Sequence, residues 1–307
     1  MNQPAPIALF AYRRRDHLDA TVQSLLRNPE APQTALTIFC DGAKGETDAD
    51  GVAAVRAYAA TVTGFALVEI VERPRNFGLA ASIIDGVTAM LARHDRVIVV
   101  EDDLLVSPHF LAYMNDGLDR YADDEEVASI HAYIYPLHQP VPETFFLRGA
   151  DCWGWATWAR AWRHFRTDGR ALLAELKAQK LTSAFDFDGA AAFTEMLENQ
   201  IRGLNNSWAI RWHAACFLDD MLTLYPGRSL VHNIGNDGSG THLTDDTQNI
   251  FGQSLTESPV TISRIPLEED LQARAAVRDY FRKIRGGIPT RILRLCRTTF
   301  KKALGAA

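Results

Sequence analysis

Three adjacent carboxylates, Glu101, Asp102 and Asp103, are the residues of this chain best suited to chemistry. They follow the four apolar residues 97–100, which have the composition of a strand buried on both faces. Adjacent carboxylates raise one another's pKa unless a cation neutralises them. Magnesium or manganese would do so, since both prefer oxygen ligands and share their other positions with water and phosphate. A solvated acidic loop explains the triplet as well, and both interpretations stay open at this point.

Polar residues also follow three other predicted strands, at residues 7–10, 36–40 and 66–71. Apolar residues at helical spacing predict helices between them, around 18–26, 50–62 and 79–91. This alternation indicates right-handed crossovers and a parallel sheet, whose carboxyl ends share one edge. An aromatic ring, a carboxylate, cations and a metal at that edge would suit a nucleoside diphosphate. The residues after the three strands are Ala11, Tyr12, Arg13, Asp41, Arg73, Arg75 and Asn76.

Composition indicates a globular protein of 307 residues with 47% hydrophobic content. No run approaches the roughly 20 apolar residues of a membrane span, and the basic residues at the N-terminus follow a very short apolar run, the reverse of a signal peptide. We therefore expect a cytoplasmic protein. Its four cysteines show no CxxC spacing, which argues against a zinc site and a disulfide framework. The net charge of −6 argues against nucleic acid as the main partner.

Several motifs, in order, resemble nucleotide-sugar-dependent glycosyltransferases of the GT-A fold. Residues 99–104 resemble the acidic metal motif of the N-acetylglucosaminyltransferase I type and its bacterial relatives. Arg75-Asn76-Phe77-Gly78 resembles the Arg-Asn-x-Gly segment of bacterial, family 2-like members. Residues 148–158 resemble the Gly-Trp acceptor segment, and residues 230–235 with Gly240-Thr241-His242 resemble the closing loop.

This resemblance implies a role for each matching residue. Asp103 would bind Mn²⁺ or Mg²⁺ with His242, while Asp102 would face the ribose or the metal's water shell and Glu101 would support both. Asp41 would hydrogen-bond the nucleotide base. Trp153 and Trp155, which flank Gly154, would contact the acceptor. The remaining nucleotide-binding residues would be Ala11, Tyr12, Arg13, Arg75, Asn76 and Gly78.

The catalytic base is where the chain departs from the resembled pattern. The eukaryotic relative carries a Trp-Asp-Asp-Trp segment, and the nearest match here, at residues 208–212, has no acid. An inverting transfer needs a base within hydrogen-bond reach of the attacking hydroxyl. Asp151, in the Gly-Trp segment, is the first candidate, followed by Glu198 and Asp220. Without such a base a retaining transfer gains weight, so the stereochemistry stays open.

We therefore expect an α/β protein with the GT-A (Rossmann-like) fold, a mainly parallel sheet flanked by helices. It would be a metal-dependent hexosyl- or N-acetylhexosaminyltransferase that moves a sugar, from a UDP-sugar foremost, to a glycan or lipid-linked glycan of a surface polysaccharide. Two alternatives are a sugar-phosphate nucleotidyltransferase and a non-catalytic glycan-binding module that uses the tryptophans. Neither GxGxxG nor GxxxxGK(S/T) follows a strand, which disfavours other nucleotide folds.

The predicted domains are a glycosyltransferase domain at 1–265, divided at residue 106 into a nucleotide-sugar half and a helix-rich acceptor half, and a basic helical tail at 266–307. Apolar residues and cations alternate at near-helical spacing in 288–302, as in an interfacial helix. The tail would hold the protein at the inner face of the membrane, and the alternative is a solvated basic segment.

Overall fold

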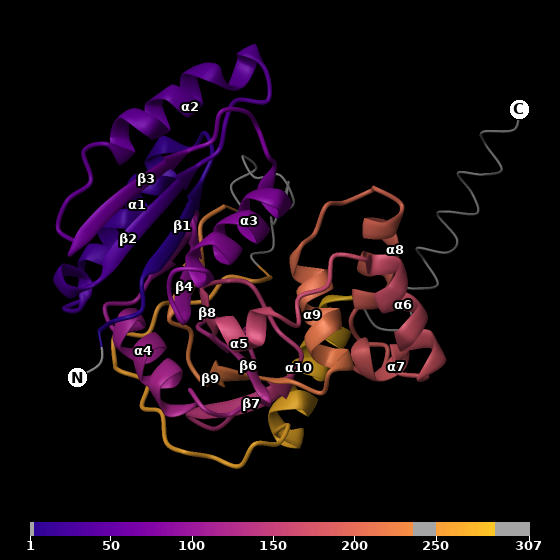
Figure 1. Ribbon diagram of the computed structural model, residues 1–307. Helices are drawn as coiled ribbons and strands as arrows, with labels where there is room; N and C mark the ends of the chain where they lie inside the picture. Colours follow the sequence, from indigo (N-terminus) through magenta and orange to yellow (C-terminus); the bar gives the residue numbers. More distant parts are fainter. Residues whose placement is uncertain (1–2, 236–249, 286–307) are drawn as a thin grey trace, which may run out of the picture.

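The structure is a computed structural model that describes residues 3–235 and 250–285 (Figure 1). Its centre is an eight-stranded sheet with the order β3-β2-β1-β4-β8-β6-β9-β7. The four strands of the first hundred residues pair in parallel, which confirms the predicted sheet. They are β1 (Ile7–Ala11), β2 (Ala35–Cys40), β3 (Leu67–Glu72) and β4 (Arg96–Glu101).

Three helices connect these strands, as predicted: α1 (Arg15–Leu26), α2 (Glu46–Ala59) and α3 (Leu79–Leu91), with a short 3₁₀ turn, η1 (Ala31–Gln33), before β2. Helix α2 begins four residues before the predicted Asp50 and ends three before Val62. Glu46 and Asp48 lie in its first turn, where negative charge stabilises the positive end of the helix dipole. The predicted start was late because it was based on the spacing of apolar residues alone.

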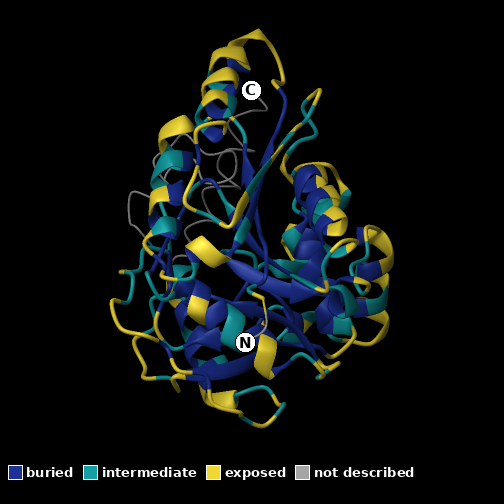
Figure 2. Ribbon diagram, turned by 60° about the vertical axis from the view of Figure 1, so that its left-hand side comes forward, coloured by how far each residue is buried: buried dark blue, intermediate teal, exposed yellow. Residues whose placement is uncertain are grey.

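The second half of the chain adds four strands to the same sheet, which the sequence analysis did not predict. They are β6 (Val127–His131), β7 (Thr144–Arg148), β8 (Trp155–Trp158) and β9 (Leu222–Pro226). Strand β8 is antiparallel to both β4 and β6, and β6 is parallel to β9. Strands β6 and β9 therefore run in the same direction as β4. Figure 2 shows the central strands buried, with exposed residues gathered on helices and loops at the rim.

A short strand, β5 (Leu104–Val106), follows the acidic residues and pairs with β10 (Val231–Asn233). Helix α4 (Phe110–Arg120) follows this strand. Ser107 closes the turn between them, where its Oγ accepts from the backbone N–H of His109 at 3.2 Å.

The next short helices along the chain are α5 (Ala159–Trp162), α6 (Gly169–Ala178), α7 (Thr182–Phe185), α8 (Phe193–Ile201) and α9 (Ala209–Leu218). Helix α5 contacts β6 and β8, whereas α6 to α9 contact one another. Helices α6 to α9 share a small apolar core that includes Leu176, Phe185 and Leu197. This half is thus a sheet extension plus a helical unit, and not only the helix-rich segment that was expected.

Helix α10 (Leu271–Ile284) lies inside the predicted tail but packs into the fold. Asp270 caps it by accepting from the N–H of Ala273 at 2.8 Å. Its buried Val277 and Phe281 join an apolar cluster with Phe145 of β7. The basic segment 288–302 lies outside the described residues. Within the described ranges, no helix combines the length and apolarity needed to cross a membrane.

Candidate active site

Glu101, Asp102 and Asp103, here called the acidic cluster, lie at the carboxyl end of β4 in the middle of the sheet. Asp102 is buried, and its Oδ2 accepts from the backbone N–H of Tyr12 at 3.3 Å. Thr21 of α1 donates its hydroxyl to the Asp102 carbonyl at 2.8 Å. The backbone and the side chain of Asp102 are therefore both held in place, so its carboxylate has a defined direction.

Arg14 is the cation that pairs with this cluster in the structure, and its place in the sequence did not indicate that role. Its Nη2 lies 2.6 Å from Asp102 Oδ1 and 2.6 Å from Asp103 Oδ2. Burial alone would lower the pKa of Arg14, but the two carboxylates raise it above its ordinary value. Arg13, which was assigned to the nucleotide pocket, pairs with Asp48 of α2. Three consecutive arginines gave no signal to tell these roles apart.

One guanidinium does not balance three carboxylates. Burial and the charges of Asp103 and Asp102 raise the pKa of Glu101 to about 8. Burial raises the pKa of Asp102 to about 6 although Arg14 opposes the shift. Oxygen ligands at a strand end with excess negative charge fit a hard divalent cation. The buried Nη1 of Arg14 has no hydrogen-bond partner among the described residues, as expected where a further group completes the site.

The described residues hold no group of three His, Cys, Asp or Glu side chains that could form a complete metal cage. Asp103 and Asp102 would supply the protein oxygens for a metal here, and His242, the other predicted ligand, lies outside the described residues. The described chain reaches the acidic cluster at Ile234, which donates its N–H to the Asp103 carbonyl at 2.8 Å. A Cβ on Gly235 would clash with the Asp103 carboxylate, so a larger residue there would force that side chain to move.

Asp41, at the end of β2, fixes the loop that carries Arg75 and Asn76. Its buried carboxylate accepts from the N–H groups of Gly42, Phe77 and Gly78 and from Asn76 Nδ2, over 2.8–3.1 Å. Gly78 has φ +75°, which favours glycine at the entry to α3. The four donors fill the usual acceptor capacity of a carboxylate. A contact from Asp41 to a nucleotide base would therefore replace one of these bonds.

Asp151 is the candidate base that the structure brings to the acidic cluster. It lies in the connection between β7 and β8, and its Oδ2 accepts from the Tyr135 hydroxyl at 2.9 Å. Burial and then the charges of Asp151, Glu101 and Asp103 raise the pKa of the Cys152 thiol. The segment that holds Asp151 and Cys152 runs into β8, which is antiparallel to β4 with Trp155 opposite Val99, so this segment lies at the end of β4 that carries the acidic cluster.

A buried histidine accompanies Asp151. His131 Nε2 lies 3.7 Å from Asp151 Oδ2, and neither ring nitrogen has a hydrogen-bond partner among the described residues. Burial lowers the pKa of His131, and the charge of Asp151 opposes that shift. The imidazole is therefore neutral at pH 7. Tyr135, His131 and Cys152, none of which the sequence analysis assigned to the site, form the surroundings of Asp151.

The other two candidate bases are elsewhere. Asp220 precedes β9, at the sheet edge opposite the acidic cluster, and pairs with Arg148 at 2.9 Å. Glu198 of α8 pairs with Lys177 at 3.1 Å and with Arg202 at 3.7 Å, in the helical unit. Asp220 and Glu198 were proposed because they are acidic, and residue type alone does not tell a surface ion pair from a catalytic base.

Trp155 does not meet the expectation that it contacts the acceptor. It is fully buried in β8 and stacks on Trp208 with ring centroids 5.3 Å apart, so it has no surface to offer a ligand. Trp153 precedes the strand and is partly exposed. It packs edge-on against Tyr133 at 4.8 Å, close to the Asp151 segment. Gly154 between the two tryptophans has φ +65°, so the chain turns before β8 begins and the two rings pack against different partners, which the Gly-Trp spacing did not reveal.

Comparison with known proteins gives one family. The sequence profile described as Glycosyl transferase family 2 matches residues 7–178. No curated protein matches the chain.

Solved structures match at low identity. TarS of S. aureus is 11% identical over 76% of this chain and 37% of its own, with a TM-score of 0.38. The mannosyltransferase PcManGT of Pyrobaculum calidifontis, solved with GDP-Man and Mn²⁺, is 15% identical over 44% of this chain and 36% of its own, with a TM-score of 0.33. The galactosyltransferase LgtC, solved with donor and acceptor sugar analogues, is 15% identical over 57% of this chain and 64% of its own, also with a TM-score of 0.33. This chain thus matches little more than a third of the first two structures.

Proposed function

The chain belongs to glycosyl transferase family 2, and we propose that it transfers a sugar from a nucleoside diphosphate sugar, a UDP-sugar foremost, to a hydroxyl group of a glycan. The observation that carries the proposal is the acidic cluster at the end of β4. Asp103 and Asp102 form ion pairs with Arg14 there, and the segment that holds Asp151 precedes β8, the neighbour of β4. An α/β sheet binds ligands at this edge, and excess carboxylate charge there calls for a cation.

Asp103 and Asp102 would hold Mn²⁺ or Mg²⁺, which when bound stabilises the negative charge on the departing diphosphate. The chain's own residues divide the remaining work. The loop fixed by Asp41 presents Arg75 and Asn76 beside the ends of β1 and β2, where the nucleotide would lie. Tyr12, whose hydroxyl donates to Asp48 at 2.6 Å, would line the base pocket together with Ala11.

Asp151 would accept the proton of the acceptor hydroxyl while that oxygen attacks the anomeric carbon and the bond to the diphosphate breaks. The Tyr135 hydroxyl donates to Oδ2 at 2.9 Å, and the backbone N–H of Cys152 donates to Oδ1 at 2.8 Å. These two bonds fix the direction of the carboxylate. Such a direct displacement inverts the anomeric centre.

A thermal-shift panel tests the proposal. UDP, GDP and CDP and their sugar conjugates are added to the protein with and without MnCl₂, since a ligand that binds only the folded state raises the melting temperature. We expect one nucleoside diphosphate to stabilise wild type only with the metal, and Asp103→Asn to lose that increment. Stabilisation by no nucleotide would refute the donor assignment.

The same panel separates the alternatives. A sugar-phosphate nucleotidyltransferase would be stabilised by a nucleoside triphosphate and would release pyrophosphate. A glycan-binding module would respond to sugars without nucleotide or metal. The surface polysaccharide acceptor and the membrane contact through residues 288–302 belong to the proposal too, and vesicle binding tests the latter (see Discussion).

A further inference from the structure

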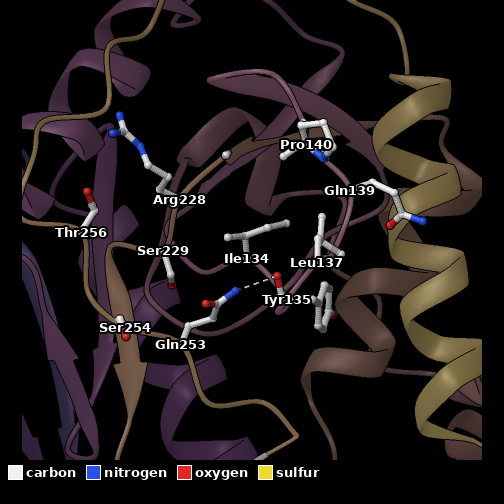
Figure 3. Close-up of a pocket in the computed structure, with 12 residues that line it drawn as sticks. Ile134, Tyr135, Leu137, Gln139, Pro140, Arg228, Ser229, Gln253, Ser254 and Thr256 are labelled. Carbon is white, nitrogen blue, oxygen red and sulfur yellow. Dashed lines mark hydrogen bonds between the residues drawn. The ribbon is translucent and has the colours of Figure 1, made fainter.

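We propose that the cavity drawn in Figure 3 binds a neutral pyranose of the acceptor glycan, adjoining the sugar whose hydroxyl reacts. The cavity has a volume of about 380 Å³ and lies between the segment after β6, the turn after β9 and residues 253–256. That volume is within the range of small-molecule sites. This inference rests on the proposed function and adds a class of ligand to it.

The cavity lies at the functional edge of the sheet. Strands β6 and β9 run in the same direction as β4, so the segments that follow them share an edge with the acidic cluster. The third wall is attached to that edge, because His232 Nδ1 of β10 lies 2.8 Å from the Gln253 carbonyl oxygen. Strand β10 pairs with β5, which directly follows the acidic cluster. The walls are thus anchored to the strands that carry the candidate chemistry.

Tyr135 joins the cavity to the candidate base. Its backbone carbonyl accepts from Gln253 Nε2 at 2.9 Å, the bond drawn as a dashed line in Figure 3. Its hydroxyl donates to Asp151 Oδ2 at 2.9 Å. One residue therefore borders both the cavity and the carboxylate that would deprotonate the acceptor. A glycan with its reacting hydroxyl at Asp151 would have its next unit beside Tyr135.

The lining matches the two kinds of surface on a pyranose. Figure 3 shows Leu137 and Pro140 on one side and Ser254 with Gln253 on another. Aliphatic side chains suit the C–H face of a sugar ring, whereas amide and hydroxyl groups both donate and accept hydrogen bonds with its hydroxyls.

The charge of the cavity favours a neutral sugar over an acidic one. Among its described lining residues Arg228 is the charged one, and its Nη2 pairs with Glu143 Oε1 at 2.6 Å. The same nitrogen also donates to the Pro259 carbonyl at 3.2 Å. A phosphate or carboxylate would meet no uncompensated cation there. The cavity thus fits hexoses or N-acetylhexosamines rather than uronic acids.

Saturation-transfer NMR on the full-length protein with UDP and MgCl₂ tests this inference. The probes are the methyl glycosides of glucose, galactose, mannose and N-acetylglucosamine, the disaccharides lactose and cellobiose, and methyl glucuronide as the acidic comparator. Ser254→Trp fills the cavity from an exposed position. Thr63→Trp, exposed in the loop after α2, is the matched control.

We expect a neutral probe to bind wild type and Thr63→Trp equally and to bind Ser254→Trp at least about tenfold more weakly, a change of roughly 1.4 kcal/mol. Unchanged binding to Ser254→Trp, no neutral probe bound by wild type, or preference for the glucuronide would each overturn the inference. Thermal shift with UDP and metal on the same samples reports the proposed function separately. If UDP and metal do not raise the melting temperature of wild type, the donor assignment is refuted. If the UDP shift is normal but Ser254→Trp binds the sugar as well as wild type does, only the cavity assignment is refuted.

Discussion

Replacing Arg14 by glutamine removes the cation that holds the acidic cluster together. Arg14 Nη2 lies 2.6 Å from both Asp102 and Asp103, and the arginine side chain is only 18% exposed. Removing one partner of a buried ion pair typically costs about 3–5 kcal/mol, and the partial exposure here favours the lower end. A loss of about 3 kcal/mol corresponds to a melting temperature lower by roughly 5 °C, because the unfolding entropy of about 2.1 cal/mol/K per residue scales with the 307 residues of the chain.

The size of this loss should depend on pH. The pKa of Asp102 is raised to about 6 and that of Glu101 to about 8, both by burial first, so the cluster is more protonated at pH 5 than at pH 8. A protonated carboxyl needs no counter-ion. The Arg14→Gln deficit without metal should therefore be large at pH 8 and shrink at pH 5.

Manganese should restore more stability to this variant than to wild type at pH 8, because it supplies the missing positive charge. A ligand at a hundredfold excess over its Kd stabilises by about 2.7 kcal/mol. Differential scanning calorimetry at pH 5 and pH 8, with MnCl₂ or EDTA, measures all four conditions. Arg15→Gln is the control, since that side chain is 47% exposed, and its ion pairs with Asp16 and Asp19 and its contact with the Tyr58 ring lie at the surface, where each contributes little. An Arg14→Gln melting temperature equal to wild type at pH 8 in EDTA would refute the reasoning.

Four further predictions follow from the same site and from the tail. Asp103→Ala should abolish transfer with the fold intact, as read by circular dichroism; full activity, or activity indifferent to a chelator, would contradict a metal-dependent transfer. Asp151→Asn should lower turnover about a hundredfold with donor affinity nearly unchanged, the usual scale for losing a general base, and a variant that keeps most of its turnover removes Asp151 from the mechanism. Glu101→Gln should be more stable than wild type at pH 8 without metal, because an acid whose pKa is raised by folding destabilises the folded state once ionised; the advantage should vanish below pH 4.5, and urea titrations at both pH values measure it. A truncation after Arg285, which keeps α10 and its buried Phe281, should sediment less than full-length protein with anionic vesicles at low salt, and equal partitioning would refute the membrane contact.

The first half of the fold could be predicted because each signal was local. Strands β1, β2 and β4 are mostly apolar, and a polar residue ends or directly follows each of them at the sheet edge. The strands of the second half give weaker signals, because their apolar runs are shorter. Strand β8 consists of Trp-Ala-Thr-Trp, which by composition resembles a tryptophan cluster, and only its pairing with β4 and β6 makes it a central strand.

The candidate site was predictable by residue type but not by partner. Glu101, Asp102 and Asp103 stand out in the sequence, whereas Arg14 comes close to them only because β1 and β4 are neighbours in the sheet. His131 and Tyr135 reach Asp151 through a connection between β7 and β8 that sequence spacing does not define. Contacts between distant segments depend on strand order, and this order was not accessible before the second-half strands were known.

These internal partners change how donor binding should be understood. The Asp41 carboxylate already accepts four hydrogen bonds, and Arg14 already neutralises Asp102 and Asp103. A nucleotide and a metal would therefore exchange existing contacts for new ones rather than fill idle groups. Net affinity is then the difference between the two sets, because each broken internal contact subtracts from the gain. In Arg14→Gln the metal has no ion pairs with Arg14 to displace. The substitution should therefore destabilise the metal-free protein and increase the stabilisation that manganese provides.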